Sequence, residues 1–194
     1  MKYLKKVRLY TGYLFFLFVL FLAKPVILSY WIGLFIVLSG EAIRTWAAGC
    51  IEKDKNLAKT GPYRLVRNPL YLGSFLIGLG VAIISCSSSF LLTFVLLFLS
   101  VYLPTIFREE KFLAEKFTDD YLNYQKTVPP FFPLKLHSHL PPPPIPSSLI
   151  LSPGGRGREG EGGRTFSWQR VKKNREFQTW IALFVILMIL GLKM

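Results

Sequence analysis

The segment GPYRLVRNPLYLG, residues 61–73, brings cationic and helix-starting residues together between two apolar stretches. Pro69 is suited to the first position of a helix, and Asn68 is suited to the N-cap position before it. The free N–H groups of a helix N-terminus favour a carboxylate or another anion. Arg64 and Arg67 could each bind a carboxylate through two hydrogen bonds. These residue types and their spacing predict an anion-binding site at the start of a helix.

The same segment contains two tyrosines and a glycine that suit a binding site. Tyr63 and Tyr71 supply flat aromatic faces and hydroxyls, and Gly73 permits the close approach of a ligand or a second helix. The residue types also fit a simpler interpretation, a basic and aromatic belt at a membrane interface that ends in a helix cap. From the residue types alone, both interpretations stay open.

A second group of charged residues follows a later apolar stretch. Glu109 and Glu110 come directly after Arg108 and could complement a cationic or hydroxyl-rich ligand. They could equally form the solvated first turn of an amphipathic helix, where acidic residues favour the helix dipole. The first charged group precedes one apolar stretch and the second follows the next. If the two stretches form a helical hairpin, both groups lie at the same membrane face, so we expect them to meet. A zwitterionic cofactor with an amino-acid part would use both.

The elements that must position these residues are membrane helices. The 194 residues are 52% hydrophobic and 15% aromatic, too apolar for a soluble domain of this size to bury. The expected fold is an all-α integral membrane protein of about five transmembrane helices, with a cytoplasmic pocket formed by loops and an interfacial helix. The transmembrane helices are expected at about 9–23, 26–48, 70–86, 90–107 and 180–192, and the interfacial helix at about 109–124.

The basic residues indicate how these helices are oriented. The net charge of +13 gathers before the first helix, between the second and third, and after the fourth. The positive-inside rule therefore places the N-terminus, the 49–69 loop and the charged site in the cytoplasm. We expect a multi-pass protein, in a bacterial inner membrane given the compact topology. The sequence contains no soluble basic module, so we do not expect a nucleic-acid partner.

The remaining polar and ligand-type residues give weaker signals. Glu41 and Arg44 share one helix face, where they could pair, reach a polar ligand or extend to the interface. The two cysteines, Cys50 and Cys86, have neither metal nor disulfide spacing. The HSH motif at 137–139 has no neighbouring carboxylates, so no metal site is expected.

The composition divides the chain into three parts. Residues 1–136 form the expected membrane core, and 137–163 form a low-complexity insert rich first in proline and then in glycine and arginine. Residues 164–194 form a basic segment followed by a last membrane helix, whose apolar run at 180–192 is short for a full span. We expect the insert to be disordered and without a catalytic role.

The motif order resembles that of the isoprenylcysteine carboxyl methyltransferase family, which is related to the phospholipid N-methyltransferases. The resemblance covers about residues 61–133 and rests on GPYRLVRNPLYLG, an apolar hairpin, REEKFLAEKF, YLNYQ and VPPFFP. It implies S-adenosyl-L-methionine bound at the cytoplasmic face. The cofactor-binding residues it implies are Tyr63, Arg67, Asn68, Pro69, Leu70, Tyr71, Gly73, Glu109 and Glu110. The characterised eukaryotic members of the family usually have histidine before the proline. Here the residue is Asn68, which cannot titrate and so cannot act as a general base.

The resemblance implies transfer of a methyl group to a carboxylate of a lipid-like acceptor. The acceptor would enter sideways from the bilayer, with Arg108 orienting it and Glu110 as the second catalytic residue. A carboxylate is ionised at neutral pH and needs no base. Three alternatives stay open: a phospholipid or amine N-methyltransferase, a sterol-reductase-like NADPH oxidoreductase, and a non-catalytic membrane subunit. A monomer would suffice for any of the enzymatic functions.

Overall fold

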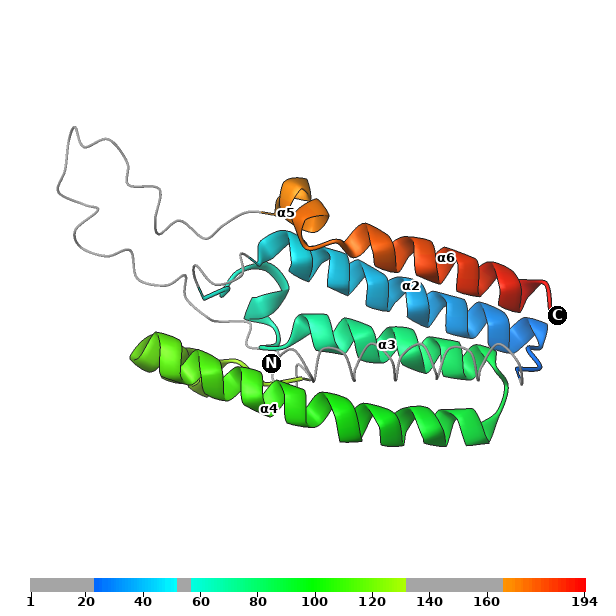
Figure 1. Ribbon diagram of the computed structural model, residues 1–194, viewed down its shortest axis with the longest axis horizontal. Helices are drawn as coiled ribbons and strands as arrows, with labels where there is room; N and C mark the ends of the chain where they lie inside the picture. The colour runs from blue at the N-terminus through cyan, green and yellow to red at the C-terminus, as the bar shows by residue number, and fades with distance from the viewer. Residues whose placement is uncertain (1–22, 52–56, 132–165) are drawn as a thin grey trace.

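The computed structural model describes residues 23–51, 57–131 and 166–194. Within these ranges the regular structure is entirely helical, as the sequence predicts. The elements are α2 (Ile27–Cys50), the short 3₁₀ helix η1 (Gly61–Arg64), α3 (Pro69–Ile84), α4 (Ser88–Thr127), α5 (Trp168–Lys173) and α6 (Glu176–Gly191) (Figure 1). The helix expected at 9–23 and the insert expected at 137–163 lie outside the described residues.

Two of the described helices, α2 and α4, are long and apolar enough to cross a membrane. The outer face of α2 is lined by exposed large apolar side chains, which suits contact with lipid. The apolar helices α3 and α6 have 16 residues each, which gives them a length of about 24 Å against a hydrocarbon core of about 30 Å. The described structure thus contains two helices of spanning length, fewer than the expected five.

Helices α2 and α3 pack closely because glycines face each other across their interface. A Cβ atom built on Gly73 would lie 2.6 Å from the carbonyl oxygen of Gly40, and one on Gly80 would lie 2.6 Å from that of Gly33. Such distances leave no room for a side chain. The glycines therefore allow the two backbones to approach as small residues do in membrane helix pairs.

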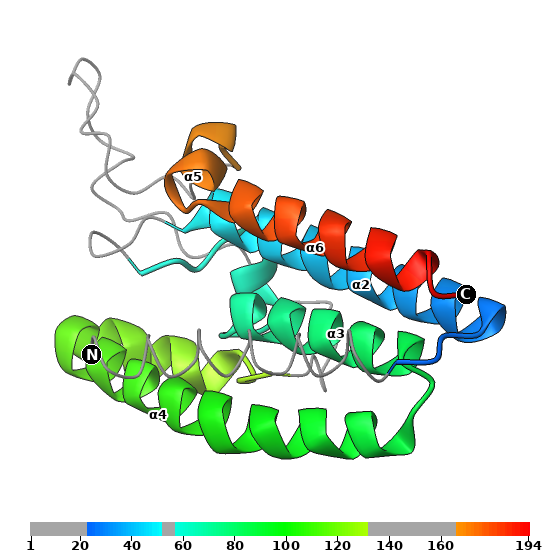
Figure 2. The ribbon, with the colours of Figure 1, turned by 45° about the vertical axis from the view of Figure 1, so that its right-hand side comes forward.

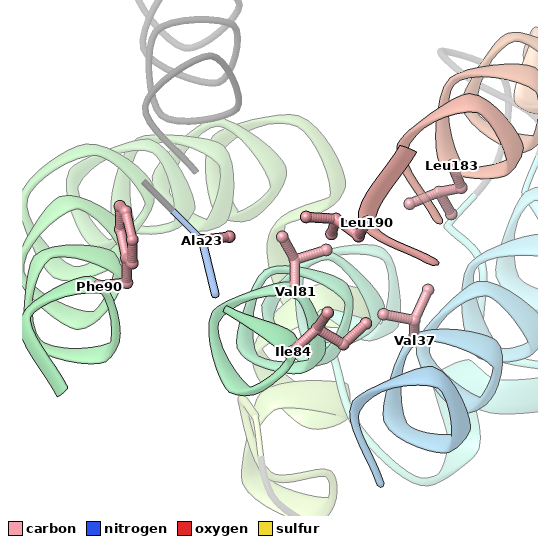
Figure 3. Close-up of a cluster of buried hydrophobic side chains, with 7 residues drawn as sticks. All are labelled: Ala23, Val37, Val81, Ile84, Phe90, Leu183 and Leu190. Carbon is pink, nitrogen blue, oxygen red and sulfur yellow. The ribbon is translucent and has the colours of Figure 1, made fainter. Parts of the chain in front are cut away.

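The main apolar cluster joins four helices, α2, α3, α4 and α6, to the segment before α2. Figure 3 shows side chains from α2, α3 and α6 pointing toward one another, with Phe90 of α4 beside Ala23. The buried members are Ala23, Val37, Val81, Ile84, Phe90, Leu183 and Leu190. The cluster joins the C-terminal end of α3, opposite the charged segment at its start, to α2 and α6.

The sequence predicts a transmembrane helix at about 90–107 and a separate interfacial helix at about 109–124, whereas the structure has one long helix, α4. It runs without interruption from Ser88 past the apolar stretch, and its helical backbone breaks only at Thr118, with φ 40° and ψ −116°. The ring of Phe131 then lies 5.9 Å from that of Phe98, although 19 helical residues beyond Phe98 carry the chain about 28 Å away. The chain therefore turns back at Thr118 (Figure 2). The boundaries predicted for the interfacial helix, 109–124, are wrong because the break follows from backbone geometry and not from an apolar–polar boundary.

The last helix, α6, begins earlier than the apolar run that predicted it at about 180. It starts at Glu176, and α6 lies beside α2 in both ribbon views (Figures 1 and 2). Two hydrogen bonds from Arg44 Nη2, of 3.2 and 3.0 Å, reach the Glu176 carboxylate. Of the roles left open for Arg44, pairing within the bundle is the observed one. Arg44 Nε also lies 4.0 Å from Glu41 Oε2.

Candidate functional site

The start of α3 and the middle of α4 are joined through Glu110. The side-chain amide of Asn68 donates to Glu110 Oε1 at 2.9 Å. Arg67 Nη1 lies 3.5 Å from Glu110 Oε2, and the Arg67 and Glu110 side chains are only 8% and 13% exposed. The expected meeting of the two charged segments is confirmed. Because the pair is largely shielded from water, its attraction is stronger than that of a surface ion pair.

A second contact, at the outer side of the same junction, joins Tyr71 and Glu109. The Tyr71 hydroxyl donates to Glu109 Oε2 at 2.6 Å, and the Tyr71 ring meets the edge of Tyr102 with centroids 6.0 Å apart. Tyr102 in turn stacks on Phe98 at 4.5 Å. The acidic residue Glu109 thus lies exposed beside an aromatic wall that continues along α4.

The segment that returns after α4 completes the junction. The backbone N–H of Arg67 donates to the carbonyl of Pro129 at 2.8 Å, and the Asn68 amide donates a second bond to the carbonyl of Pro130 at 3.1 Å. Tyr124 donates its hydroxyl hydrogen to the carbonyl of Tyr63 at 2.6 Å. Three parts of the chain that are distant in sequence therefore enclose residues 63–68.

Asn68 occupies the N-cap position that the sequence predicts, but its side chain does not cap the helix. Its backbone carbonyl accepts from the N–H groups of Tyr71 and Leu72, and no side-chain cap bond forms. The amide is instead used on Glu110 and Pro130. In this chain Asn68 therefore connects elements, a role for which a neutral donor suffices.

Several buried polar atoms at the junction have no hydrogen-bond partner among the described residues. They are the Tyr63 hydroxyl, Nε and Nη1 of Arg67, and the Tyr121 hydroxyl. Of these, Arg67 Nη1 is ion-paired with Glu110, and the Tyr121 hydroxyl interacts with Arg67. Burial raises the pKa of the Tyr63 hydroxyl well above its usual value of 10.0, and nearby Tyr124 and Glu109 raise it further. Tyr63 thus stays neutral and available as a donor. Buried donors without partners are uncommon and mark a place for a polar ligand.

Sequence reasoning missed Tyr121, which is almost fully buried at this junction. The one signal available was its place in the YLNYQ motif, beside Tyr124. Its position depends on the reversal of the chain at Thr118, which no local pattern indicates.

The other predicted residues occupy different positions. Pro69 is fully buried, and Leu70 packs against the cluster of Ala47, Cys50 and Tyr63. Gly73 faces α2, where Gly40 and Arg44 lie against it. Arg108, like Arg64, is exposed and is not brought into the junction. Across the described ranges, no group of three or more histidine, cysteine or acidic residues is arranged to hold a metal ion.

Comparisons with known proteins agree with the resemblance in the motifs. The family model described as phospholipid methyltransferase matches residues 8–120. The cobalt-zinc-cadmium resistance protein CzcN of Cupriavidus metallidurans is 33% identical over 112 residues, which cover 57% of this chain and 50% of that protein. No solved structure matches.

Two eukaryotic relatives have names that agree with the same family. Protein-S-isoprenylcysteine O-methyltransferase of Schizosaccharomyces pombe is 33% identical over 98 residues, covering 50% of this chain and 42% of that protein. The enzyme of that name from Xenopus laevis is 32% identical over 114 residues, covering 53% and 40%. The chain thus spans about half or less of the length of these relatives.

Proposed function

This chain belongs to the phospholipid methyltransferase family, and we propose that it transfers a methyl group from S-adenosyl-L-methionine to a carboxylate of a lipid-like acceptor in the membrane. The observation that carries the proposal is the double contact of Arg67 and Asn68 with Glu110. It joins the two charged segments that the family resemblance assigns to the cofactor.

The residues at the junction fit the charges of this cofactor. S-adenosyl-L-methionine has a sulfonium, an ammonium and a carboxylate, and when bound it supplies an activated methyl group. Glu109 and Glu110 would hold the cationic groups. Nε of Arg67 and the Tyr63 hydroxyl, which have no hydrogen-bond partner among the described residues, would hold the carboxylate. The aromatic wall of Tyr71, Tyr102 and Phe98 offers flat faces for a heterocycle.

The chain's own residues align the reactants and move no proton. An acceptor carboxylate is already ionised at neutral pH, which agrees with a junction where Asn68 cannot titrate and Tyr63 stays neutral. Catalysis then rests on proximity and on exclusion of water. Exposed Arg108, directly after exposed Phe107, would orient the acceptor carboxylate at the membrane surface.

A second candidate function is N-methylation of a phospholipid amine. The description of the family model favours it. An amine acceptor has to lose a proton, and Glu109 is the exposed carboxylate of the junction that could accept it. The products distinguish the two functions, since an ester is cleaved by base and a methylamine is stable.

The location follows from the helices and charges. We place the protein as a multi-pass protein of a bacterial inner membrane, with the junction on the cytoplasmic side according to the positive-inside rule. The acceptor would arrive sideways from the bilayer, and one copy of the chain supplies every residue of the junction. Exposed apolar side chains on α2 and α4 support contact with lipid.

Cofactor binding by the detergent-solubilised full chain tests the proposal. Wild type and Arg64→Ala, which changes an exposed arginine, are expected to bind S-adenosyl-L-methionine. Arg67→Ala and Glu110→Ala are expected to weaken binding at least about tenfold, because each leaves a buried charge without its partner. Absence of binding by folded wild type would refute the proposal. Transfer of radiolabelled methyl to membrane extract, followed by base treatment, then identifies the acceptor class.

A further inference from the structure

We propose that α5 and the first turn of α6 form a binding site for an anionic phospholipid, separate from the methyl-transfer site. The site comprises Trp168, Lys172, Lys173, Arg175, Phe177 and Trp180, which we call the C-terminal patch. It lies outside residues 8–120, the part that matches the family. The inference does not depend on the proposed function.

The patch is held rigidly on the end of α2. The N–H of Ser167 donates to the carbonyl of Gly49 at 3.1 Å, and the Asn174 amide donates to that of Ala48 at 2.8 Å. Between these bonds, Val171 is buried. Helix α5 thus satisfies carbonyls that the last turn of α2 leaves free, and its opposite face points outward.

The turn between α5 and α6 determines which residues are exposed. Arg175 has φ 60° and ψ 29°, in the left-handed region, and the chain changes direction there, so that α5 lies across the end of α2 and α6 (Figures 1 and 2). Since α6 is apolar and runs beside α2, a membrane that contains them places α5 at its surface. The start of α3 lies at the same end of the bundle (Figure 1).

The apolar part of the patch is hollow and aromatic. A hollow of about 330 Å³ is lined by Trp168, Val171, Lys172, Phe177 and Trp180. Trp168 is 61% exposed, although it meets the edge of Trp180 at 6.5 Å. Exposed tryptophans next to basic residues are typical of side chains placed among lipid headgroups, so the hollow fits part of an acyl chain.

The polar part of the patch is cationic. Lys172, Lys173 and Arg175 are all exposed, and none has a carboxylate partner among the described residues. Of the described acidic residues near the patch, Glu176 is buried and bonded to Arg44, and Glu41 interacts with Trp180. Three exposed cations that have no carboxylate partner in the described part of the chain lie beside an apolar hollow. They complement a lipid that combines a negative headgroup with acyl chains, which a zwitterionic lipid does not match.

Tryptophan quenching in nanodiscs tests the assignment. In a Trp31→Phe, Trp46→Phe background, the full chain keeps two of its four tryptophans, Trp168 and Trp180. We expect brominated phosphatidylglycerol to quench them at least about twofold more than brominated phosphatidylcholine at low salt, with the difference falling as salt rises. Adding Lys172→Gln and Lys173→Gln should bring the two lipids to equal quenching. Lys111→Gln with Lys126→Gln, two exposed lysines on α4, should keep the preference.

Other outcomes overturn the proposal. Equal quenching of the parent protein by both lipids, or quenching by neither, would show that the patch does not select an anionic lipid. Loss of the preference in the control variant would show a general charge effect. If inorganic phosphate removes the preference more than chloride does at equal ionic strength, the site binds free phosphate and not the lipid.

Discussion

The side-chain amide of Asn68 donates at 2.9 Å to Oε1 of Glu110, 42 residues further along the chain. This contact holds the start of α3 against the part of α4 beyond the apolar stretch, and Arg67 and Pro130 take part in the same junction. Asn68 stands at the position where the family resemblance would lead one to expect a histidine. Substitutions of Asn68 should therefore have effects that depend on whether the new side chain can donate a hydrogen bond to Glu110.

Replacing Asn68 should have an effect that depends on the charge of the new side chain. Asn68→Asp places a carboxylate against Glu110 and removes the donor, so we expect cofactor binding to weaken about tenfold or more. Asn68→His keeps a ring N–H donor and should bind within about threefold of wild type. Isothermal titration of the solubilised variants with S-adenosyl-L-methionine measures both. Equal binding by Asn68→Asp and wild type would contradict the role given to this contact.

Substitutions of two buried tyrosines should affect cofactor binding and protein stability differently. The Tyr63 hydroxyl has no hydrogen-bond partner within the described residues, so Tyr63→Phe should leave the thermal midpoint nearly unchanged and weaken cofactor binding. Tyr124 donates to the carbonyl of Tyr63, so Tyr124→Phe should lower the free energy of unfolding by about 1 kcal/mol. Thermal unfolding in detergent and cofactor titration of the same samples provide the comparison. A Tyr63→Phe protein that is clearly less stable yet binds normally would oppose this assignment.

The pair of Arg44 and Glu176 should be the main polar contact that holds α6 on α2. Its side chains are 20% and 7% exposed, and Arg44 also donates to Ser74 of α3. Removing one partner leaves a largely buried charge, so Glu176→Met or Arg44→Met should each cost about 3 kcal/mol of stability.

The double variant Arg44→Met, Glu176→Met provides the control for this pair. Replacing both charges by apolar side chains should recover part of the loss, because neither member of the pair is then left without the other, although Glu41 loses its contact with Arg44. Denaturant unfolding of all four proteins gives the coupling energy. Strictly additive losses would mean that the two side chains do not stabilise one another.

Gly73 is expected to act through packing between α2 and α3. Gly73→Ala puts a methyl group against the carbonyl of Gly40 and should cost about 1–3 kcal/mol of stability. Gly191→Ala is the matched control, because its methyl group would approach only the flexible end of Tyr30, at 3.2 Å. Thermal midpoints of both variants test this. A stable Gly73→Ala protein that had lost cofactor binding would instead support contact with the cofactor.

The sequence could predict the start of α3 and its meeting with Glu109 and Glu110, because proline at a first helical position and charge at the ends of apolar stretches are local signals. It could not predict the reversal at Thr118, which is a backbone conformation unusual for a β-branched residue. For the same reason it gave no sign that the carbonyls of Pro129 and Pro130 complete the junction.

The last helix starts before the apolar run at 180–192 for a different reason. A charged residue such as Glu176 marks a boundary when an apolar run is read by hydropathy, yet here it begins the helix because Arg44 neutralises it inside the bundle. Pairing across elements is invisible in a single stretch of sequence. The same holds for Tyr121, which becomes part of the junction only after the chain has returned.

The bonds from Arg67 and Asn68 to Pro129 and Pro130 also bear on the biosynthesis of the protein. They connect residues about sixty positions apart, with α3 and all of α4 between them. While the chain is being inserted, α2 and α3 can pair as soon as both have left the ribosome. The junction can close only after α4 has been inserted and the chain has folded back, so α2 and α3 can pair while Arg67 and Asn68 are still apart from Pro129 and Pro130.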